Sequence, residues 1–456
     1  MNLHNKKIHM IGIGGVGMSG LAYVLARMGC AVSGSDIEEN VITKRLRRKG
    51  VIVHIGHSAS RLHAPEVIVY SSSIRADNSE LVEARFKKIP VISRIELLRM
   101  VMEKYRKTIG VLGTHGKTTT TAMVSLLTEY AGMDPTVLIG GDSPHFRGNA
   151  KIGKSKMLVT EIDESDGRFV CLRPTHILMP NLEREHAEFY RDEAHLVNVF
   201  KRFISAQPER SAFFYRIEDA NLRKLAKVSK GKVFSFGFSK EADLYAAGIK
   251  IEAYKTGFDC FSRGRKIGRF ILRIPGIHNV IDGLAALSLG VELGIDSGTM
   301  KRAMAAYKNV RRRFEVIGDL NGAKVVEDYA HHPTEIRATI TAAYSTKPKR
   351  IITVFQPHRY TRTKVFFKEF SNSFAGSDEV ILTEVYAASE ERLRGAGAKR
   401  IYDAMRRTSH IPVKLLGKNE IPGYLSKKTK KGDLILVLGA GDIGKTAHEL
   451  VSGVKK

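Results

Sequence analysis

Lys107–Thr121, KTIGVLGTHGKTTTT, is the stretch of this sequence that decides the fold. Residues 108–112 predict a short buried strand, and the turn that follows leads into a helix starting near Thr118. Glycines let successive backbone N–H groups face one point, the helix N-terminus adds partial positive charge, and Lys117 adds a full charge. The turn predicts a cradle for a triphosphate, and the Thr118 hydroxyl suits Mg²⁺. Val111 stands where a strict P-loop has glycine, so a plain strand-to-helix turn is the alternative. The predicted cradle consists of Gly113, Thr114, His115, Gly116, Lys117, Thr118 and Thr119.

A second glycine-rich turn lies near the N-terminus, between a strand predicted over Lys6–Ile11 and a predicted helix. Residues 12–17 read GIGGVG, and the next predicted strand ends at Asp36. This is G-x-G-x-x-G followed by an acidic residue about 20 positions on, a pattern that lets a pyrophosphate approach a helix N-terminus. Any nucleotide diphosphate satisfies it, so a dehydrogenase that binds NAD or FAD is one alternative and glycines for close packing are another. The glycines expected at the pyrophosphate are Gly14, Gly15 and Gly17.

Polar residues follow two further predicted strands of this first segment. Ser71, Ser72 and Ser73 come after a strand over Val67–Tyr70. Hydroxyls at the carboxyl end of a strand are placed to meet phosphate or sugar oxygens, and a capped turn is the alternative. His57 either contacts a base or is an ordinary surface-loop histidine.

Acidic residues follow a strand predicted over residues 157–162, MLVTEI. A carboxylate at a strand end beside a P-loop is where the metal ligand of a nucleotide site belongs, which favours Glu161. Alternation lets Glu161 and Asp163 face the same way, whereas Asp166 is better explained by an acidic turn. His186 follows the next predicted strand, and we expect it to contact metal or phosphate, with a structural histidine as the alternative.

Residues 243–275 alternate short β-like runs with turns, which predicts a hairpin elaboration of the central domain. Asn279 follows at the start of a predicted helix. Its position predicts first of all an N-cap, although its amide could also contact a base.

In the C-terminal third, two predicted strands, 325–327 and 351–355, end in clusters that together contain His, Arg and Tyr. Such clusters suit a pocket that binds a carboxylate, and Arg359 and Arg362 share one face if they are helical. A last strand over Leu434–Leu438 runs into a second G-x-G-x-x-G. Few residues follow it, so it predicts a last strand, turn and helix rather than a complete dinucleotide-binding unit.

Lysine and arginine outnumber aspartate and glutamate by 74 to 47, which gives a formal charge of +27 over 456 residues. This charge raises the hypothesis of a nucleic-acid-dependent ATPase. However, the basic runs are short and scattered, the chain has no tryptophan, and no run interleaves aromatic and basic residues. We therefore predict no nucleic-acid partner; an anionic small-molecule substrate explains part of the charge.

Cysteine spacing and hydropathy indicate in which cellular compartment the protein is expected. Cys30, Cys171 and Cys260 lie far apart, which argues against a zinc site or a disulfide framework and fits a reducing cytosol. No uninterrupted apolar run reaches the ~20 residues of a transmembrane helix, so we predict no membrane association.

The motifs taken in order resemble the Mur ligases of peptidoglycan synthesis over essentially the whole chain. They are GIGGVGMSG, GTHGKTTTT, EIDESDG, NLEREH, PGIHN, RRF, DYAHHPTEI, FQPHRYTRT and VLGAGDIGK. GTHGKTTTT alone would indicate a Mur or folylpolyglutamate ligase. DYAHHPTEI and FQPHRYTRT are specific to the alanine-adding branch or to its close relative that reattaches recycled murein peptide.

The resemblance implies an α/β protein of three domains. These are a Rossmann-like UDP-sugar-binding domain over residues 1–107, a central P-loop domain binding ATP and Mg²⁺ over 108–313, and a Rossmann-like amino-acid-binding domain over 314–456. It implies an ATP-dependent, ADP-forming ligase that joins L-alanine to the lactyl carboxylate of UDP-N-acetylmuramate through an acyl phosphate. The alternative is the ligase that recycles murein tripeptide. It also implies Mg²⁺ or Mn²⁺ as cofactor, a cytoplasmic location, and a monomer or weak homodimer.

The resemblance assigns roles residue by residue. The expected catalytic residues are Lys117, His186, His331 and Arg359. Besides the P-loop, ATP would meet Asn279, Arg313 and Asp328. The UDP-sugar would meet Gly14, Gly15, Gly17, Asp36, His57, Ser71 and Ser72. Alanine would meet Tyr329, His331, His358, Arg359 and Arg362. The expected metal ligands are Thr118, Glu161 and His186, and no carbamylated lysine is expected.

Two positions and one loop depart from the family pattern. Glu185 replaces an aspartate and lengthens the arm, and Asp282 replaces a second asparagine in the adenine helix. Residues 388–394 lack the glycine and proline that the family shows in this loop.

Overall fold

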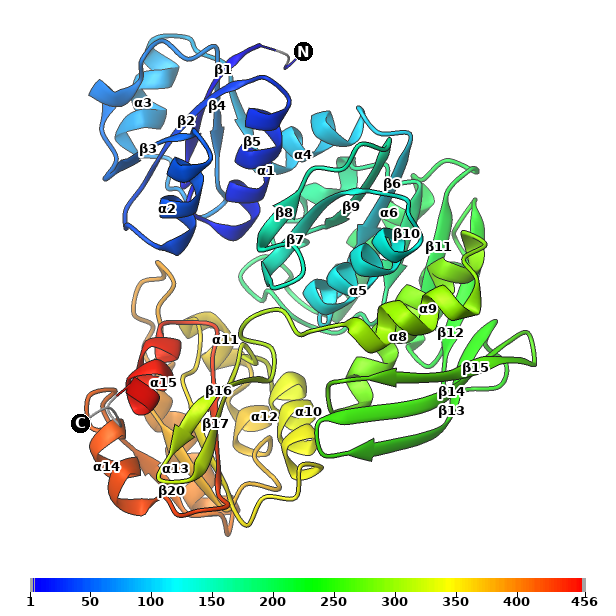
Figure 1. Ribbon diagram of the computed structural model, residues 1–456. Helices are drawn as coiled ribbons and strands as arrows, with labels where there is room; N and C mark the ends of the chain where they lie inside the picture. Colours follow the sequence, from blue (N-terminus) through cyan, green and yellow to red (C-terminus); the bar gives the residue numbers. More distant parts are fainter. Residues whose placement is uncertain (1–2, 4, 453–456) are drawn as a thin grey trace. The chain divides into compact units, whose positions relative to one another are not determined.

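The computed structural model of the chain describes residue 3 and residues 5–452. The outer ends of the first and last predicted domains, residues 1, 2, 4 and 453–456, lie outside the described residues. Figure 1 shows the ribbon, coloured along the sequence. The chain forms two compact units. The first unit comprises Met1–Leu182, Val197–Leu244 and Leu284–Ala303, and the second comprises Glu183–Leu196, Tyr245–Gly283 and Met304–Lys456. The three cysteines, all described, are free thiols.

The first unit begins with a five-stranded parallel sheet of order β3-β2-β1-β4-β5, with helices on both faces (Figure 1). The chain moves from β1 to β2 on one side and later returns to β4 on the other. The carboxyl end of β1 is therefore the switch point where such sheets bind ligands, and the turn at residues 12–17 lies there. The strands are β1 (Lys7–Ile11), β2 (Ala31–Asp36), β3 (Ile52–Ile55), β4 (Val67–Tyr70) and β5 (Val91–Ser93). The helices are α1 (Val16–Arg27), α2 (Val41–Arg48), η1 (Ala59–Arg61), α3 (Ser79–Phe86) and α4 (Arg94–Met102).

The P-loop strand lies inside the second sheet of this unit. The unit's strands follow the order β12-β11-β10-β6-β9-β7-β8, parallel except for β8 against β7. Because β6 has β10 on one side and β9 on the other, the P-loop and the two segments after β9 and β10 leave the sheet at one edge. The strands are β6 (Lys107–Val111), β7 (Thr136–Ser143), β8 (Gly148–Lys151), β9 (Met157–Glu161), β10 (His176–Met179), β11 (Ala212–Arg216) and β12 (Lys232–Gly237). The helices that follow β6 along the chain are α5 (Lys117–Tyr130), η2 (Arg168–Cys171), α6 (Glu193–Ser205), α7 (Ala220–Ala226), α8 (Ile277–Glu292) and α9 (Ser297–Ala306).

The predicted hairpins over residues 243–275 are confirmed as three consecutive strands. They are β13 (Leu244–Glu252), β14 (Lys255–Ser262) and β15 (Arg265–Leu272), and β14 pairs antiparallel with β15. The prediction that Asn279 is an N-cap is wrong. The helix α8 begins at Ile277, so Asn279 lies in the first turn.

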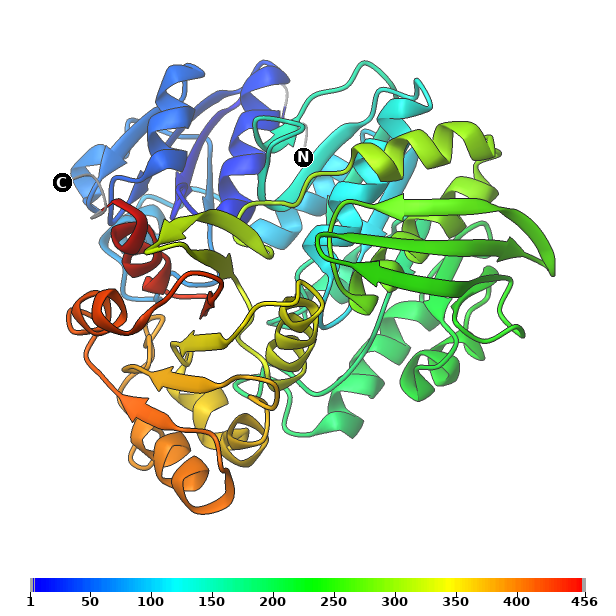
Figure 2. The ribbon, with the colours of Figure 1, turned by 60° about the horizontal axis from the view of Figure 1, so that its bottom comes forward.

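The C-terminal sheet of the second unit has the order β16-β17-β21-β18-β19-β20, with helices on both faces (Figure 2). The strand β21 has a continuous apolar sequence because its alternate residues are buried on opposite faces of the sheet. Leu434, Leu436 and Leu438 belong to one core cluster, whereas Ile435 and Val437 belong to the cluster on the other face. The strands are β16 (Glu315–Leu320), β17 (Ala323–Asp328), β18 (Ile351–Phe355), β19 (Glu379–Leu382), β20 (Val413–Leu415) and β21 (Leu434–Leu438). The helices are α10 (Pro333–Tyr344), α11 (Tyr360–Val365), α12 (Phe367–Ser371), α13 (Ala398–Thr408), α14 (Ile421–Lys428) and α15 (Ile443–Ser452).

The last element confirms the interpretation of the second G-x-G-x-x-G. The strand β21 ends at Leu438, and α15 begins at Ile443 after a short turn. Among the described residues, no helix combines the length and the apolar character that crossing a bilayer requires.

Gly34 in β2 marks a place where the backbone of the first sheet has no room for a side chain. A Cβ there would lie 2.4 Å from the carbonyl oxygen of Met10 and 2.7 Å from a methyl of Ile13. The oxygen is backbone in a neighbouring strand, so it cannot move without disturbing the β1–β2 ladder.

We expect Gly34→Ala to lower the free energy of unfolding by about 1–3 kcal/mol, because overpacking forces backbone shifts. Urea denaturation followed by circular dichroism measures this change. Gly423→Ala in α14 is the control, since a Cβ there meets nothing within 4 Å and stability should stay within about 1 kcal/mol. Equal midpoints for the two variants would contradict the role given to Gly34.

Candidate active site

The P-loop is shaped by an asparagine from the neighbouring strand connection. Asn181 follows β10, and its amide oxygen accepts from the His115 N–H at 2.8 Å while its amide nitrogen donates to the His115 carbonyl at 2.9 Å. Gly116 precedes α5 with φ 76°, a conformation that favours glycine. The first N–H groups of any α-helix have no carbonyl partner within the helix. Those of α5 can therefore bind an anion, as the sequence predicts for this helix N-terminus. Sequence reasoning missed Asn181, because its role depends on the pairing of β10 with β6.

Lys117 is held in place by oxygen atoms on three sides. Its Nζ donates to the carbonyls of Gly113 at 2.7 Å and Thr114 at 3.0 Å, and it pairs with Glu164 at 2.8 Å. Burial alone would lower the pKa of Lys117, but Glu164, Glu161 and Asp163 raise it above its ordinary value. The side chain therefore carries its full charge at neutral pH, which suits a group that faces phosphate.

Two of the predicted metal ligands lie together in the first unit. The Thr118 Oγ1 is 2.8 Å from a carboxylate oxygen of Glu161, and the Gly140 N–H donates to the same oxygen at 2.9 Å. A Cβ at Gly140 would lie 2.2 Å from that oxygen, so the backbone approaches the carboxylate as closely as glycine allows. A hydroxyl and a carboxylate are hard oxygen ligands of the kind Mg²⁺ prefers, so these residues fit the ion.

The first glycine turn is tied to Asp36 and has histidine and serine beside it. The Gly14 N–H donates to Asp36 at 2.8 Å. His57 is bonded through Nδ1 to Ser35 at 2.9 Å and lies 3.4 Å from the buried Glu80, so it is fixed rather than a loose surface residue. Contact between His57 and a base stays a prediction.

Both glycine turns border one cavity of about 270 Å³ in the first unit, which we name the shared cavity. The predicted residues that line it are Gly15, Gly17, Ser71, Ser72, Lys117 and Glu161. Sequence reasoning missed Arg94 and Asn149, which also line it. Asn149 donates to the Val16 carbonyl at 2.6 Å and to the Ser19 hydroxyl at 2.9 Å, and so ties α1 to β8.

The second unit gathers most residues of the predicted alanine site. The rings of His331 and His358 lie 5.8 Å apart, with Tyr329 at 5.4 Å from His331. Arg362 donates from Nε to Glu185 at 2.8 Å, and both side chains are about 5% exposed. Burial would raise the pKa of Glu185, but Arg362 and nearby histidines hold it well below its ordinary value.

Both histidines of this cluster are neutral at physiological pH. Burial lowers the pKa of His331 to about 4 and that of His358 to about 2, with cationic neighbours adding to the shift for His358. The Nδ1 of His331 lies 3.0 Å from the Tyr329 carbonyl, which can only accept, so this nitrogen carries the hydrogen. Nε2 is consequently the acceptor atom of the ring.

Arg359 occupies an unusual backbone position between two carboxylates. It precedes α11 with φ 69° and ψ 137°, a conformation that costs a non-glycine residue energy. Its guanidinium lies 3.6 Å from Glu188 and 3.5 Å from Glu390. Glu188 also lies 3.2 Å from Nδ1 of His186, the third predicted metal ligand, whose φ is 51°.

Asp328 and Asn279, two further predicted residues of the second unit, are buried and hydrogen-bonded. Asp328 accepts from the Phe314 and Ala330 N–H groups, each at 2.7 Å, and burial raises its pKa to about 6 although Arg313 opposes the shift. Asn279 donates to the Pro275 carbonyl at 2.6 Å. Their contacts with ATP stay predictions.

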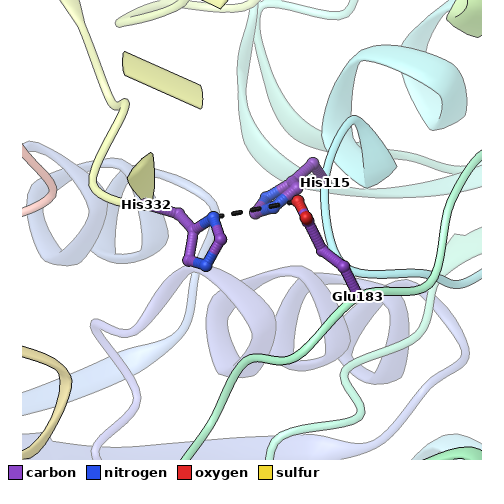
Figure 3. Close-up of side chains that lie close together, drawn as sticks. All are labelled: His115, Glu183 and His332. Atoms are coloured by element: carbon purple, nitrogen blue, oxygen red, sulfur yellow. Dashed lines mark ion pairs between the residues drawn. The ribbon is translucent and has the colours of Figure 1, made fainter. Parts of the chain in front are cut away.

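His332 and Glu183 are two further residues of the second unit whose side chains lie close together, as Figure 3 shows. The His332 Nδ1 lies 3.8 Å from Glu183, whose other oxygen accepts from the Thr334 hydroxyl at 3.1 Å. His332 also caps α10 by accepting from the Thr334 N–H. The start of α10 thus places His331 and His332 beside the segment that carries Glu183 and Glu185.

Family models match three consecutive segments of the chain. Residues 7–106 match the Mur ligase family, catalytic domain, residues 111–290 the Mur ligase middle domain, and residues 312–441 the Mur ligase, glutamate ligase domain. The chain belongs to the Mur ligase family. The family and the three-domain α/β fold expected from the motifs are thereby confirmed.

Individual relatives of this Mur ligase match it over nearly its whole length. The UDP-N-acetylmuramate–L-alanine ligase of Trichlorobacter lovleyi is 40% identical over 449 residues, covering 98% of both chains. The crystal structure of UDP-N-acetylmuramate-alanine ligase MurC from Thermotoga maritima has a TM-score of 0.85 at 28% identity and covers 99% of both chains. A murein peptide ligase from Psychrobacter arcticus, with a TM-score of 0.74 at 23% identity over 98% of both chains, shares the fold.

We expect Glu185→Gln to lower the free energy of unfolding of this Mur ligase by about 3–5 kcal/mol at pH 7, because it leaves the Arg362 charge buried without its partner. Urea denaturation measures the change. The lowered pKa of Glu185 means that its contribution is present above its unfolded value near 4.5 and is lost as the pH falls further, so the difference from the parent protein should shrink below about pH 4.5.

The matched control is Glu391→Gln, on an exposed residue of the same charge, which should change stability by less than about 0.5 kcal/mol. A Glu185→Gln protein as stable as this control at pH 7 would show that the pair with Arg362 contributes nothing.

Proposed function

We propose that this Mur ligase joins L-alanine to the lactyl carboxylate of UDP-N-acetylmuramate, using ATP and releasing ADP and phosphate, in the synthesis of peptidoglycan precursors. The observation that carries the proposal is the full-length similarity to UDP-N-acetylmuramate–L-alanine ligases. The shared cavity supports it, because one space borders both the glycine turn suited to a UDP diphosphate and the lysine suited to ATP. A dehydrogenase or a nucleic-acid-dependent ATPase would explain one of these features and leave the other without a role.

To form an amide, the carboxylate must first carry a better leaving group than oxide on its carbonyl carbon. A carboxylate oxygen of the sugar substrate attacks the γ-phosphorus, the bond to ADP breaks, and an acyl phosphate forms. Positioning and charge neutralisation dominate such a step, and Lys117 supplies a full positive charge beside the N-terminus of α5. Asn181 and Glu164 hold the loop and the lysine in place before the substrates bind.

Thr118 and Glu161 would hold Mg²⁺, which supplies positive charge to the phosphate oxygens as they develop negative charge. His186 is proposed as a ligand of a second Mg²⁺. Its left-handed backbone and its contact with Glu188 fix the ring.

The second step forms the amide. The alanine nitrogen attacks the acyl carbon, the C–O bond to phosphate breaks, and the nitrogen loses a proton. The neutral His331 offers Nε2 as the acceptor for that proton, since its Nδ1 is committed to the Tyr329 carbonyl. Arg359 is proposed to bind the alanine carboxylate, for which a planar guanidinium is the natural partner.

The finer assignments belong to the same proposal. We place the reaction in the cytoplasm, with small molecules as partners and neither nucleic acid nor membrane involved, and we expect a monomer or weak homodimer. The proposal includes domain limits at residues 107 and 313. It also includes contacts of ATP with Arg313, Asp328 and Asn279, and of alanine with Tyr329.

Phosphate release by the purified protein tests the activity. With ATP and Mg²⁺ we expect release that requires both UDP-N-acetylmuramate and L-alanine. A Lys117→Met protein should be slower by at least about 10²-fold, which excludes a contaminating ATPase. Release with L-Ala-γ-D-Glu-meso-diaminopimelate in place of alanine would instead assign the recycling reaction, and no release with either would overturn the proposal.

Arg359→Ala should raise the KM for alanine by roughly 10–100-fold, because a charge-assisted hydrogen bond pair is lost, and should leave the KM for ATP within about twofold. Steady-state kinetics with each substrate varied in turn measure both constants. Lys364→Ala, on an exposed lysine of the helix α11 that Arg359 precedes, is the control and should change neither. Unchanged alanine kinetics in Arg359→Ala would remove Arg359 from the amino-acid site.

A further inference from the structure

Arg94 is a cation of the shared cavity that no sequence motif indicates. It is the first residue of α4, and the preceding Ser93 forms a capping box with Glu96 that fixes where this helix starts. Its side chain is 15% exposed, so it is largely withdrawn from bulk water. The same cavity is lined by Gly15, Gly17 and Lys117.

The guanidinium of Arg94 lies against the first glycine turn. A Cβ added to Gly17 would lie 2.9 Å from Nη1 and 3.3 Å from Cδ of Arg94. The last glycine of G-x-G-x-x-G is usually explained by close helix–strand packing. Here its missing side chain leaves the space in which the arginine lies beside the N-terminus of α1.

Asp163 holds Arg94 in this position before any substrate binds. Its Oδ2 accepts from Nη2 of Arg94 at 2.7 Å, and its Oδ1 accepts from the Ser165 N–H at 2.9 Å. The same loop is fixed a second time, since Nη1 of Arg168 donates to the Tyr70 hydroxyl at 2.9 Å. An arginine ordered in this way loses little conformational freedom when an anion binds.

Arg94 has donors left for a ligand. A guanidinium carries five N–H donors in a planar fork, and among the described residues the one hydrogen bond that Arg94 donates is from Nη2 to Asp163. Lys117, by contrast, directs its ammonium at three protein oxygens. The two cations of the cavity thus differ, and the planar fork of Arg94 matches a phosphate or a carboxylate.

We propose that Arg94 binds an anionic oxygen of the UDP-sugar in the shared cavity, and so determines how the sugar substrate is held next to Lys117. This inference rests on the proposed function. The oxygen belongs either to the diphosphate or to the lactyl carboxylate, and both chemistries suit the guanidinium.

Isothermal titration calorimetry of the full-length protein with three ligands tests the proposal and separates the two sources. The ligands are UDP, UDP-N-acetylglucosamine, which lacks the lactyl carboxylate, and UDP-N-acetylmuramate. For Arg94→Gln we expect a Kd for UDP-N-acetylmuramate raised roughly 10–100-fold. An equal loss for all three ligands assigns the contact to the diphosphate, and a loss confined to UDP-N-acetylmuramate assigns it to the carboxylate.

Arg99→Ala is the matched control, because Arg99 lies on the same helix, is exposed, and pairs with Glu103 at 2.8 Å. It should bind all three ligands as the parent does. If Arg94→Gln does not fold, Arg94→Lys replaces it in the same titrations. Its affinity for UDP-N-acetylmuramate is expected to fall roughly 3–10-fold, because a point charge replaces the planar guanidinium. Parental affinity of the folded Arg94 variant for all three ligands would overturn the inference while leaving the proposed function intact. Failure of the parent protein to bind UDP-N-acetylmuramate would instead overturn the proposed function.

Discussion

The pairing of β10 with β6 is the constraint on which the nucleotide site depends. In this parallel register Leu178 lies opposite Val111, so the segment after β10 passes directly beside the P-loop. Asn181 can then satisfy both the N–H and the carbonyl of His115, as a neighbouring strand would. The pairing of β9 on the other side brings Glu161 to Thr118 in the same way. Two ladders of backbone hydrogen bonds thus position side chains that the sequence separates by more than forty residues.

Compensated charge is the second organising feature, and it recurs in both units. Lys117 is paired with Glu164, and Arg362 with Glu185. A buried cation without a partner would destabilise the fold, whereas a carboxylate beside it removes most of that cost. An enzyme that handles anionic substrates can therefore keep cations ready in sites that exclude water. The surplus of lysine and arginine over acids elsewhere in the chain is not explained by these sites.

Local motifs were predictable, and contacts between distant segments were not. The glycine turns and the carboxylate after β9 are each contained in a few consecutive residues, so spacing alone indicated them. Arg94 contacts Asp163 and Glu185 contacts Arg362, and neither pair leaves a signal in the spacing. Asn279 shows that helix ends are hard to predict, because α8 begins three residues earlier than an N-cap at Asn279 requires and Asn279 lies in the first turn instead. Glu185 departs from the family pattern in the sequence itself, but its partner Arg362 is identified only by the fold.

The position of β21 in the C-terminal sheet has a consequence for synthesis on the ribosome. This strand is the last of the chain, yet it lies between β17 and β18 and contributes to the cores on both faces. While earlier strands emerge, β17 and β18 have no central partner to pair with, and their edges stay open to wrong partners. The sheet can close only once residues 434–438 have left the exit tunnel. Folding of this part is therefore expected to wait for residues 434–438, whereas the five-stranded N-terminal sheet, whose strands are complete by Ser93, can form much earlier in synthesis.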